Sequence, residues 1–570
     1  MILVHKKFRI FVVRKFGMIR VYAQILRGSK IDKKMKKIRS YNSSRVIIIK
    51  TSDAQNTFQN RTFDTLIPFL TIITNKMAVR MHYFSKKFSL FSLIFLFFQT
   101  PKSAVAQAQL GLRLENYAGI NGISLNPTAG LHNPLGWDIN IVAAGSFFDN
   151  NYAFIRNANV ISVLNNVQNI SFAPEAKIDY PKKSAYVMDF HNQNQVKYLS
   201  SATFVTLPSV QLNFANGNSF GLFWGQQATV VSRNIPTIAD PYEQQKIAVN
   251  QRVSIPAFNI TGATWGEVGI NWAHNFGSDT EGGLSVGTTV KWIRPNQVFF
   301  VDNREGTAIT RLTKDSTRLD ALNLGVGFTT NFADKNVPSN GSGVGVDVGA
   351  TYVWATGDAW DNRPYQVRIS AAVLDIGRFT VSNNAQVRDI QFTTPLKLQS
   401  ADYKNLDPND PATDAIRRFD QNVFGRADAT LRSNSFALSL PTSMVFQADF
   451  AVLSSFFING LLVQRVPSAN RNLSKDNILA VTPRYESRWL SASLPVSVLN
   501  YEQIRVGLAA RLAFLVIGTD NLGSFLGQKR LTGSDFYVAL KINAFKIGQL
   551  KGGTGLFNGG DGKAAKCYKF

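Results

Sequence analysis

The stretch Val344-Gly345-Val346-Asp347-Val348-Gly349-Ala350-Thr351-Tyr352 alternates, residue by residue, between apolar side chains and small or polar ones. Successive side chains of an extended strand point to opposite faces, so the stretch predicts a β-strand with one apolar face and one small or polar face. The same alternation recurs along the chain, in the segments 137–143, 268–272, 284–292, 322–332, 504–514 and 536–542. The sequence therefore predicts an all-β fold made of many similar strands.

The length of these strands indicates their surroundings. The alternating segments run for about nine to eleven residues, which matches a tilted strand that crosses a lipid bilayer. Strands of water-soluble domains are usually about five or six residues long. A sheet that faces lipid must close on itself, because lipid cannot satisfy the backbone groups of an open edge. We expect a single antiparallel transmembrane β-barrel of about 14 strands, with long polar loops and a polar interior.

Short turns predict that neighbouring strands are antiparallel. Asn216-Gly217, the segment 276–279 and Asn459-Gly460 each separate two apolar runs. Asn-Gly adopts the positive φ angles of the turn that suits the twist of a β-hairpin. We therefore predict hairpin turns at all three places, with the short turns on the periplasmic side of the barrel.

Four tryptophans lie near the ends of alternating runs, at positions 137, 265, 292 and 354. Indole is apolar with one polar N–H, and tryptophans of membrane barrels form girdles at the two lipid boundaries. The alternative is that these side chains belong to the core of an ordinary β-sandwich. We expect the girdle, because no internal disulfide is possible and the number of strands is large.

Three longer polar stretches, 164–200, 234–262 and 378–433, separate groups of strands, and the last shows no strand periodicity. In a barrel they would be surface loops or a plug folded into the interior. We find no internal repeat of fixed length and no linker that would mark a second globular domain.

Composition agrees with a surface that faces lipid. Hydrophobic residues make up 45% of the chain and charged residues 17%, against roughly 25% charged in soluble proteins. The net charge of +25 comes mostly from residues 1–106, which carry 21 Lys and Arg against 3 Asp and Glu. Residues 107–570 have a net charge of +7, so nothing indicates binding of nucleic acid. The one cysteine, Cys567, excludes an internal disulfide and a cysteine-based zinc site.

The segment from Met81 has the three parts of a secretory signal peptide. Basic Lys86-Lys87 precedes an apolar run of about ten residues and the small-residue site Ala104-Val105-Ala106. Such a run is too short to span a bilayer as a helix. We expect a signal peptide at 81–106, cleaved after Ala106 or Ala108, and translation starting at Met77 or Met81. Residues 1–80 are then a non-native extension; a basic cytosolic arm is the alternative.

Short motifs resemble a known group of proteins. Asn126-Pro127-Thr128-Ala129 before the first strand resembles the opening of Bacteroidota-type outer-membrane barrels, and Val373-Leu374-Asp375-Ile376-Gly377 resembles a strand exit of one uncharacterised group among them. The segments 518–522 and 535–541 resemble the same group, over nearly all of 107–550. The resemblance implies an outer-membrane barrel, distantly similar to fatty-acid-transporter-like barrels and to accessory barrels of type IX secretion. Membrane barrels usually end on an aromatic residue of the last strand, whereas here a tail, 551–570, follows. We interpret this tail as flexible and Cys567 as an incidental thiol; a docking peptide is the alternative.

No residue stands out as catalytic, as a metal ligand or as cofactor-binding. Ser219 and Ser285 lie in Gly-x-Ser-x-Gly matches, but one lies at a hairpin turn and the other inside a strand, without the strand-to-helix turn that exposes a nucleophile. His132, His191 and His274 are far apart, and the glycines at 343, 345 and 349 lead into no helix. Gly562-Lys563 lacks the spacing of a phosphate loop. Arg505 and Arg511 lie opposite the apolar face, so we expect them to line a polar interior, either selecting anions or only solvating it.

We therefore expect an outer-membrane channel or uptake protein for an unknown solute that is not an enzyme and has no cofactor. Two alternatives are a non-conducting accessory or scaffold barrel of a secretion or surface complex, and a soluble periplasmic β-protein. The expected partners are outer-membrane lipid, the barrel-assembly machinery and, for the second alternative, a secretion or surface complex.

Overall fold

The computed structural model of the protein describes residues 8–15, 18–25 and 108–543. The last range has gaps at 167–169, 173–185, 192–196, 237–246, 278–281, 314, 333–337, 357–362, 404, 408–409, 468–472 and 528–529. The chain forms two compact units, Met1–Gln99 and Thr100–Phe570. In the first unit, β1 (Phe8–Lys15) and β2 (Met18–Ile25) form an antiparallel hairpin. The predicted signal peptide at 81–106 and the predicted tail at 551–570, with Cys567, lie outside the described residues.

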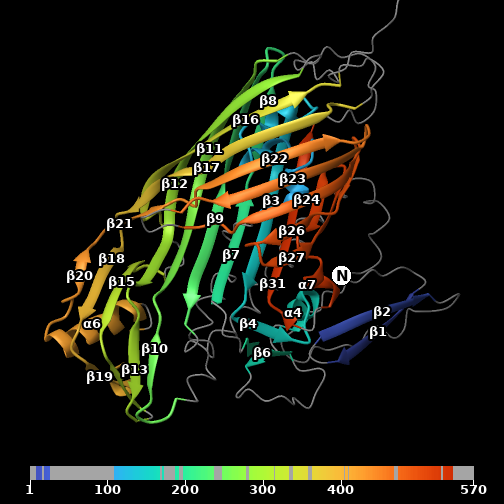
Figure 1. Cartoon of the computed structure of the whole chain (residues 1–570). Helices are drawn as coiled ribbons and strands as arrows, with labels where there is room; N and C mark the ends of the chain where they lie inside the picture. The colour runs from blue at the N-terminus through green and yellow to red at the C-terminus, as the bar shows by residue number, and fades with distance from the viewer. Residues whose placement is uncertain are drawn as a thin grey trace, which may run out of the picture. The chain divides into compact units, whose positions relative to one another are not determined.

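The second unit is a closed antiparallel barrel of 14 strands (Figure 1). Neighbours along the chain are neighbours in the sheet, and β31 closes the barrel by pairing with β3, Asp138 opposite Asn543. In order, the strands are β3 (Trp137–Asn150), β7 with β8 (Lys197–Thr206, Ser209–Asn213), β9 (Asn218–Ile235), β11 (Phe258–Asn275), β12 (Gly282–Asn303), β15 with β16 (Leu322–Thr329, Gly341–Trp354), β17 with β18 (Val367–Val381, Ala385–Phe392), β20, β21 and β22 (Leu431–Ser433, Phe436–Ser439, Ser443–Ala451), β23 (Phe456–Arg465), β24 (Ile478–Glu486), β25 with β26 (Leu490–Ser493, Val496–Leu499), β27 with β28 (Gln503–Val506, Leu508–Leu512), β29 (Leu515–Thr519) and β31 (Gly533–Asn543). The predicted fold class is confirmed.

Proline explains several of the strands that appear in two pieces. Pro208, Pro441 and Pro495 stand between β7 and β8, between β21 and β22, and between β25 and β26. Proline has no backbone N–H to give to the ladder, so pairing stops there and resumes beyond it. Each broken strand still fills one position in the wall.

The two faces of the wall have opposite chemistry. Every second side chain points outward, and the outward positions on all sides of the barrel carry exposed apolar residues, among them Leu222, Trp224, Ile270, Val290, Val348, Ile369, Phe446, Ile458, Val481, Ile504, Ile517 and Leu540. The side chains between them point into the interior, here called the lumen. These lumen residues are buried and many are polar or charged, among them Lys291, Asp347, Asp449, Thr482, Arg484, Arg511 and Lys541.

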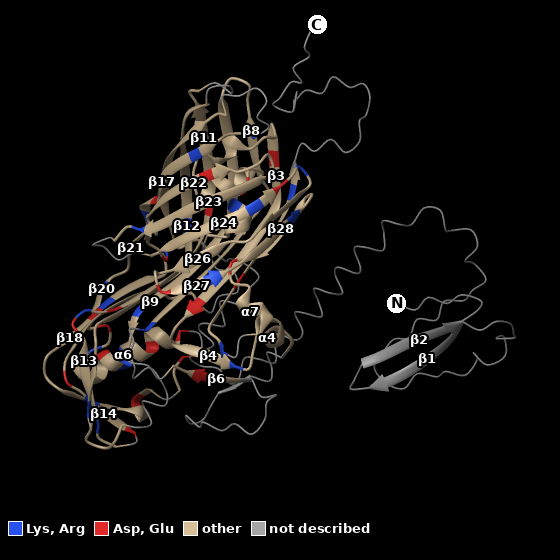
Figure 2. Cartoon of the chain, turned by 45° about the vertical axis from the view of Figure 1, so that its right-hand side comes forward, with Lys and Arg blue, Asp and Glu red and all other residues tan. Residues whose placement is uncertain are grey.

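The two ends of the barrel also differ. At one end, here called the turn end, β3 begins, β31 ends, and short connections join strands at 214–217, 276–281, 452–455 and 487–489. At the other end, the loop end, most connections are long, at 151–196, 304–321, 393–430 and 520–532, although only residues 500–502 join β26 to β27. Figure 2 shows charged residues gathered around β13 (Thr307–Arg311), β14 (Ser316–Leu319), β18 and α6 (Pro411–Phe424), and sparse along the upper strands.

The long connections carry structure of their own. β13 and β14 pair with β10 (Arg252–Ile255) and β19 (Leu396–Gln399) in a four-stranded sheet. β4 (Ala153–Arg156), β5 (Ile170–Phe172), β6 (Tyr186–Phe190) and β30 (Arg530–Leu531) form a second such sheet. The connections also hold α4 (Val160–Asn166), η5 (Ser400–Tyr403) and α7 (Gly523–Leu526). Helix α6 begins after Asp410, whose side chain accepts a hydrogen bond from the Thr413 amide, and ends at Gly425, where φ is +73°.

Several predictions about local structure were wrong. Asn459-Gly460, predicted to be a hairpin turn, lies in the middle of β23. Asn459 faces the lumen and pairs with Asp449 and Thr482 of the neighbouring strands, so the strand continues through it and the turn falls at 452–455. The stretch 378–433, predicted to be a surface loop or an inward-folded plug without strands, contains the end of β17, then β18, β19, α6 and β20. Strand β12 has 22 residues, so it is much longer than the strands of about nine to eleven residues that the sequence predicted.

The Asn216-Gly217 turn is confirmed, with φ of +78° at Gly217. Trp292 and Trp354 face outward, with 52% and 43% of their surface exposed, whereas Trp265 is only 3% exposed and lies inside the lumen. Trp265 stands an even number of residues before the buried Asn271, so the alternation of β11 itself turns it inward, and its place near the end of an apolar run did not indicate its face. The segment 373–377 is likewise no strand exit, because β17 continues through it with a kink at Asp375, where φ is +56°.

Candidate functional site

Residues 108–136 lie inside the barrel and are here called the plug. They form α3 (Leu110–Arg113) and the 3₁₀ turns η1 (Gly119–Ser124) and η2 (Ala129–His132) before the chain enters β3. Leu110, Leu112, Leu114 and Leu125 are buried, together with Phe147, Phe204, Val445 and Ile478 of the wall. The hydrophobic core of this protein therefore lies in the lumen, between the plug and the wall. The segment that fills the barrel is the plug and not one of the long polar stretches for which this position was considered.

The first anchor of the plug lies beside β29 and β31. The amide of Leu110 donates to Asp520 over 3.0 Å, and the amide of Gly111 donates to the Tyr537 hydroxyl over 3.0 Å. That hydroxyl donates in turn to Asp520. A side chain at Gly111 would meet the Ala509 Cβ atom at 2.1 Å, so only glycine allows this approach.

The second anchor is a buried ion pair. Glu115 of the plug accepts a hydrogen bond from Arg511 Nε of β28 over 2.9 Å, and another from Ser491 over 2.7 Å. Both charged side chains are buried, so each depends on the other for compensation of its charge. The next amide, of Asn116, donates to Glu486 over 3.1 Å.

The third anchor lies at the turn end. Lys541 of β31 donates to the plug carbonyls of Tyr117 and Ala118, both over 2.7 Å, and pairs with Asp138 at 3.1 Å. Asp138 also accepts the amide hydrogen of Ile120. The ammonium group of Lys541 thus connects β31 with the plug and with β3.

The motif Asn126-Pro127-Thr128 attaches the plug to the opposite wall. Asn126 accepts from the amide and hydroxyl of Thr128, and Thr128 shares a 2.6 Å hydrogen bond with Thr351 of β16. Asn271 of β11 donates to the Pro127 carbonyl over 3.0 Å. The sequence identified this motif only as a resemblance, and its structural role is to bind the plug to the lumen wall.

The wall facing the plug carries further buried ion pairs. Arg484 binds Asp449 through both terminal nitrogens, at 2.7 and 2.6 Å, and also contacts Glu486. Arg368 reaches the same Asp449 at 2.8 Å. Such clusters are stable only when each charge has partners, and removing one member leaves a buried charge uncompensated.

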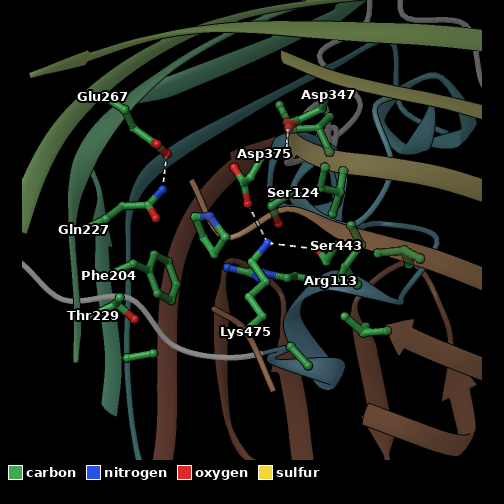
Figure 3. Close-up of a pocket in the computed structure, with 18 of the residues that line it drawn as sticks. Arg113, Ser124, Phe204, Gln227, Thr229, Glu267, Asp347, Asp375, Ser443 and Lys475 are labelled. Atoms are coloured by element: carbon green, nitrogen blue, oxygen red, sulfur yellow. Dashed lines mark hydrogen bonds and ion pairs between the residues drawn. The ribbon is translucent and has the colours of Figure 1, made fainter. Parts of the chain in front are cut away.

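A cavity of about 120 Å³ lies between the plug and the wall toward the loop end (Figure 3). Part of its lining is apolar and part is charged. The apolar residues are Phe204, Leu374, Val445, Val463 and Ile478, and the charged residues are Arg113, Glu267, Lys291, Asp347, Asp375, Lys475 and Asp476.

Most of these charges are already paired. Lys291 binds Asp347 at 2.8 Å and also contacts Asp375, which Lys475 reaches at 2.6 Å. Asp476 pairs with Arg233 at 3.1 Å. Arg113 and Glu267 differ, because among the described residues neither has an ion-pair partner. Arg113 lies over the Phe204 ring at 5.2 Å, and Glu267 accepts hydrogen bonds from Gln227 and Trp265, both neutral donors.

The residues singled out in the sequence are not brought together. Arg505 and Arg511 do line the lumen, as predicted, and pair with Asp149 and Glu115. His132 lies in η2 of the plug, and burial lowers its pKa to about 3. Ser219 starts β9 after its hairpin turn and Ser285 lies inside β12, as expected.

Within the part of the chain that is described, no three His, Cys, Asp or Glu residues are grouped so that they could hold a metal ion. No helix among the described residues is long and apolar enough to cross a bilayer, a finding that does not bear on crossing by strands.

The plug and the cavity were missed in the sequence. Their signal was the Leu-rich segment between the predicted signal peptide and the first strand, which has no period of two that continues into a strand and has glycines at 111, 119 and 122. The charges of the cavity come from strands far apart in the chain, so no local motif could have revealed them.

Comparison with solved structures gives membrane barrels at low similarity. The toluene transporter TodX of P. putida aligns at 8% identity and a TM-score of 0.34, over 75% of this chain and 94% of that one. The translocator domain of the autotransporter NalP from Neisseria meningitidis aligns at 10% and 0.24, over 77% and 100%. A Pseudomonas aeruginosa FadL homologue aligns at 9% and 0.19, over 77% and 98%.

No curated protein sequence matches the chain. A family model, described as a family of unknown function and designated DUF5723, matches residues 148–520. This match agrees with the predicted resemblance to an uncharacterised family, while an origin in Bacteroidota stays a prediction. The chain belongs to the DUF5723 family.

Proposed function

We propose that the protein is an outer-membrane β-barrel that serves as a channel or uptake path for a small solute. The observation that carries the proposal is a lumen closed by a segment of the chain itself, next to an internal cavity. Polar contacts hold the plug at four places, and water can replace each of them when the plug moves. A lumen lined with charged groups can therefore fill with water, as a path for a polar solute requires.

The outer surface supports a place in a membrane. Exposed apolar side chains cover the outward positions around the barrel, where lipid would contact them. A soluble periplasmic protein would expose this surface to water at a large cost in free energy. In membrane barrels of this kind, short turns and chain ends lie on the periplasmic side, so the turn end would face the periplasm and the loop end the exterior. Lipid and the barrel-assembly machinery are the partners that this location implies.

Reconstitution of the purified protein into liposomes tests the proposal. We expect heat-modifiable migration on gels, which is typical of a folded membrane barrel, and swelling of the liposomes in an isotonic solution of a permeant solute. Swelling should increase strongly when residues 108–135 are deleted. Absence of swelling from both proteins, with heat-modifiable migration intact, would contradict a role as a channel.

A second function, that of an accessory barrel in a surface or secretion complex, is favoured by the structured loop end. Two four-stranded sheets and α6 would offer a shaped surface to a partner. Affinity isolation from gently solubilised membranes distinguishes the two functions. Stable stoichiometric partners together with a silent barrel would favour the complex.

A further inference from the structure

The cavity beside the plug has a charge pattern that the protein itself leaves incomplete. The four groups Lys291, Lys475, Asp347 and Asp375 balance one another, and Asp476 is balanced by Arg233. One cation, Arg113, and one anion, Glu267, remain without an ion-pair partner among the residues described. Buried charges are costly unless they are paired, so a cavity of this kind suits a ligand that carries both opposite charges.

The position of Arg113 is fixed from two sides. Its backbone belongs to α3 of the plug, and its guanidinium lies over the ring of Phe204 in β7. Burial lowers the pKa of Arg113 to about 10, so the side chain keeps its positive charge at neutral pH. A guanidinium in this position presents several N–H donors and suits a carboxylate in particular.

Glu267 approaches from the wall on the side of β9 and β11, next to Gln227 (Figure 3). Gln227 and Trp265 give it two hydrogen bonds and hold its carboxylate at the cavity. Neither hydrogen-bond donor is charged, and the nearby Lys291 forms its ion pairs with Asp347 and Asp375, so the carboxylate keeps the capacity to bind an ammonium group.

The size and the remaining lining limit the rest of the ligand. An apolar cavity of about 150 Å³ holds benzene, which has six non-hydrogen atoms, so about 120 Å³ admits a molecule of roughly five or six non-hydrogen atoms. Phe204, Leu374, Val445 and Val463 offer an apolar surface to a short aliphatic group.

We infer that the cavity is a binding site for a small zwitterion, an α-amino acid with a short aliphatic side chain. The carboxylate of the ligand binds Arg113, its ammonium group binds Glu267, and its side chain lies against the apolar lining. The inference rests on the proposed function, because it names the class of solute that the channel takes up. The plug supplies Arg113, so binding of the solute also depends on the position of the plug.

Binding of radiolabelled L-alanine to the purified full-length barrel in detergent tests this inference. Two competitors each lack one charge of alanine: propionate lacks the ammonium group, and alaninamide lacks the carboxylate. We expect alanine to bind and each competitor to bind about ten- to a hundredfold more weakly, the effect of one charge-assisted hydrogen bond.

Two variants assign the charges. Arg113→Gln should weaken alanine binding about as much as removal of the carboxylate does, and should leave alaninamide binding unchanged. Glu267→Gln should weaken alanine binding and leave propionate binding unchanged. Arg318→Gln and Glu305→Gln remove the same charges at exposed positions of the loop end and serve as matched controls. Heat-modifiable migration checks that every variant is folded.

The outcomes separate the site from the channel. If alanine fails to bind to a folded barrel, or if propionate or alaninamide competes as well as alanine, the zwitterion site is wrong. The swelling of the plug-deleted barrel, which lacks Arg113, does not depend on this site. Swelling without alanine binding would therefore overturn this inference alone, and alanine binding without swelling would overturn the channel alone.

Discussion

The outer and inner faces of the same strands follow opposite rules. On β11, Ile270 points outward and is exposed, while its neighbour Asn271 points into the lumen and is fully buried. The same alternation puts Val481 outside and Thr482 and Arg484 inside on β24. A water-soluble protein covers its surface with polar residues, whereas the outer face of this barrel is apolar and its inner face carries buried charges, most of them in pairs. The surroundings of each face decide which side chains it tolerates: the plug inside and, under the proposed function, lipid outside.

The largest effect should come from breaking an inner charge cluster. Arg484→Leu leaves Asp449 and Glu486 buried with one cation fewer, so we expect a loss of about 3 to 5 kcal/mol in the free energy of unfolding. Urea unfolding in liposomes, followed by tryptophan fluorescence and gel migration, measures it. Arg318→Leu, in the exposed pair with Asp320, is the control and should change little. Equal stability of the two variants would mean that the cluster does not hold the barrel together.

A charge placed on the outer face should lower the free energy of unfolding somewhat less, and only when lipid surrounds the barrel. We expect Ile270→Lys to lower the free energy of unfolding by about 2 to 4 kcal/mol if the position lies near the middle of the bilayer. Val249→Lys, on the loop end, places the same charge at an exposed site and should be neutral. An Ile270→Lys variant as stable in liposomes as the wild type would show that this face does not contact lipid.

A smaller effect should appear at the plug. Glu115→Gln removes the charge that Arg511 binds while keeping the shape of the side chain, which should weaken plug docking by about 1.5 to 3 kcal/mol. We expect more frequent opening, seen as about tenfold or more channel events in planar bilayers. Glu305→Gln, at the loop end, is the matched control. Unchanged opening would indicate that this anchor does not keep the lumen closed.

The smallest effect should be a dependence on pH. Burial, with Asp535 nearby, raises the pKa of Asp520 at the first anchor. A carboxyl group with a raised pKa favours the protonated form, so stability is highest at low pH and falls as pH rises from about 4, its ordinary pKa, toward the raised value. Arg113, Arg505 and Tyr537 also face this group. The thermal midpoint of the wild type should fall over this range. Asp520→Asn should flatten the dependence, and an equally steep curve for the variant would assign it to another group.

The sequence predicted the features that repeat and missed those that depend on a single contact. The period of two identified the barrel, its strand number and the inward placement of Arg505 and Arg511, because each strand carries that pattern itself. Trp265 was misplaced, because the girdle was predicted from its position near the end of a run and not from the phase of β11. Asn459-Gly460 was misplaced, because the pairing register decides where the chain turns between β22 and β23. The plug and the Arg113 and Glu267 cavity could not be predicted, because their residues meet only when the barrel closes.

Single-channel recording of the wild-type barrel and of the variant lacking residues 108–135 tests the central claim most directly. We expect the wild type to be closed most of the time and the deletion to give a stable open conductance, with heat-modifiable migration unchanged. A folded deletion variant that conducts no more than the wild type would contradict the claim that the plug closes a transmembrane path.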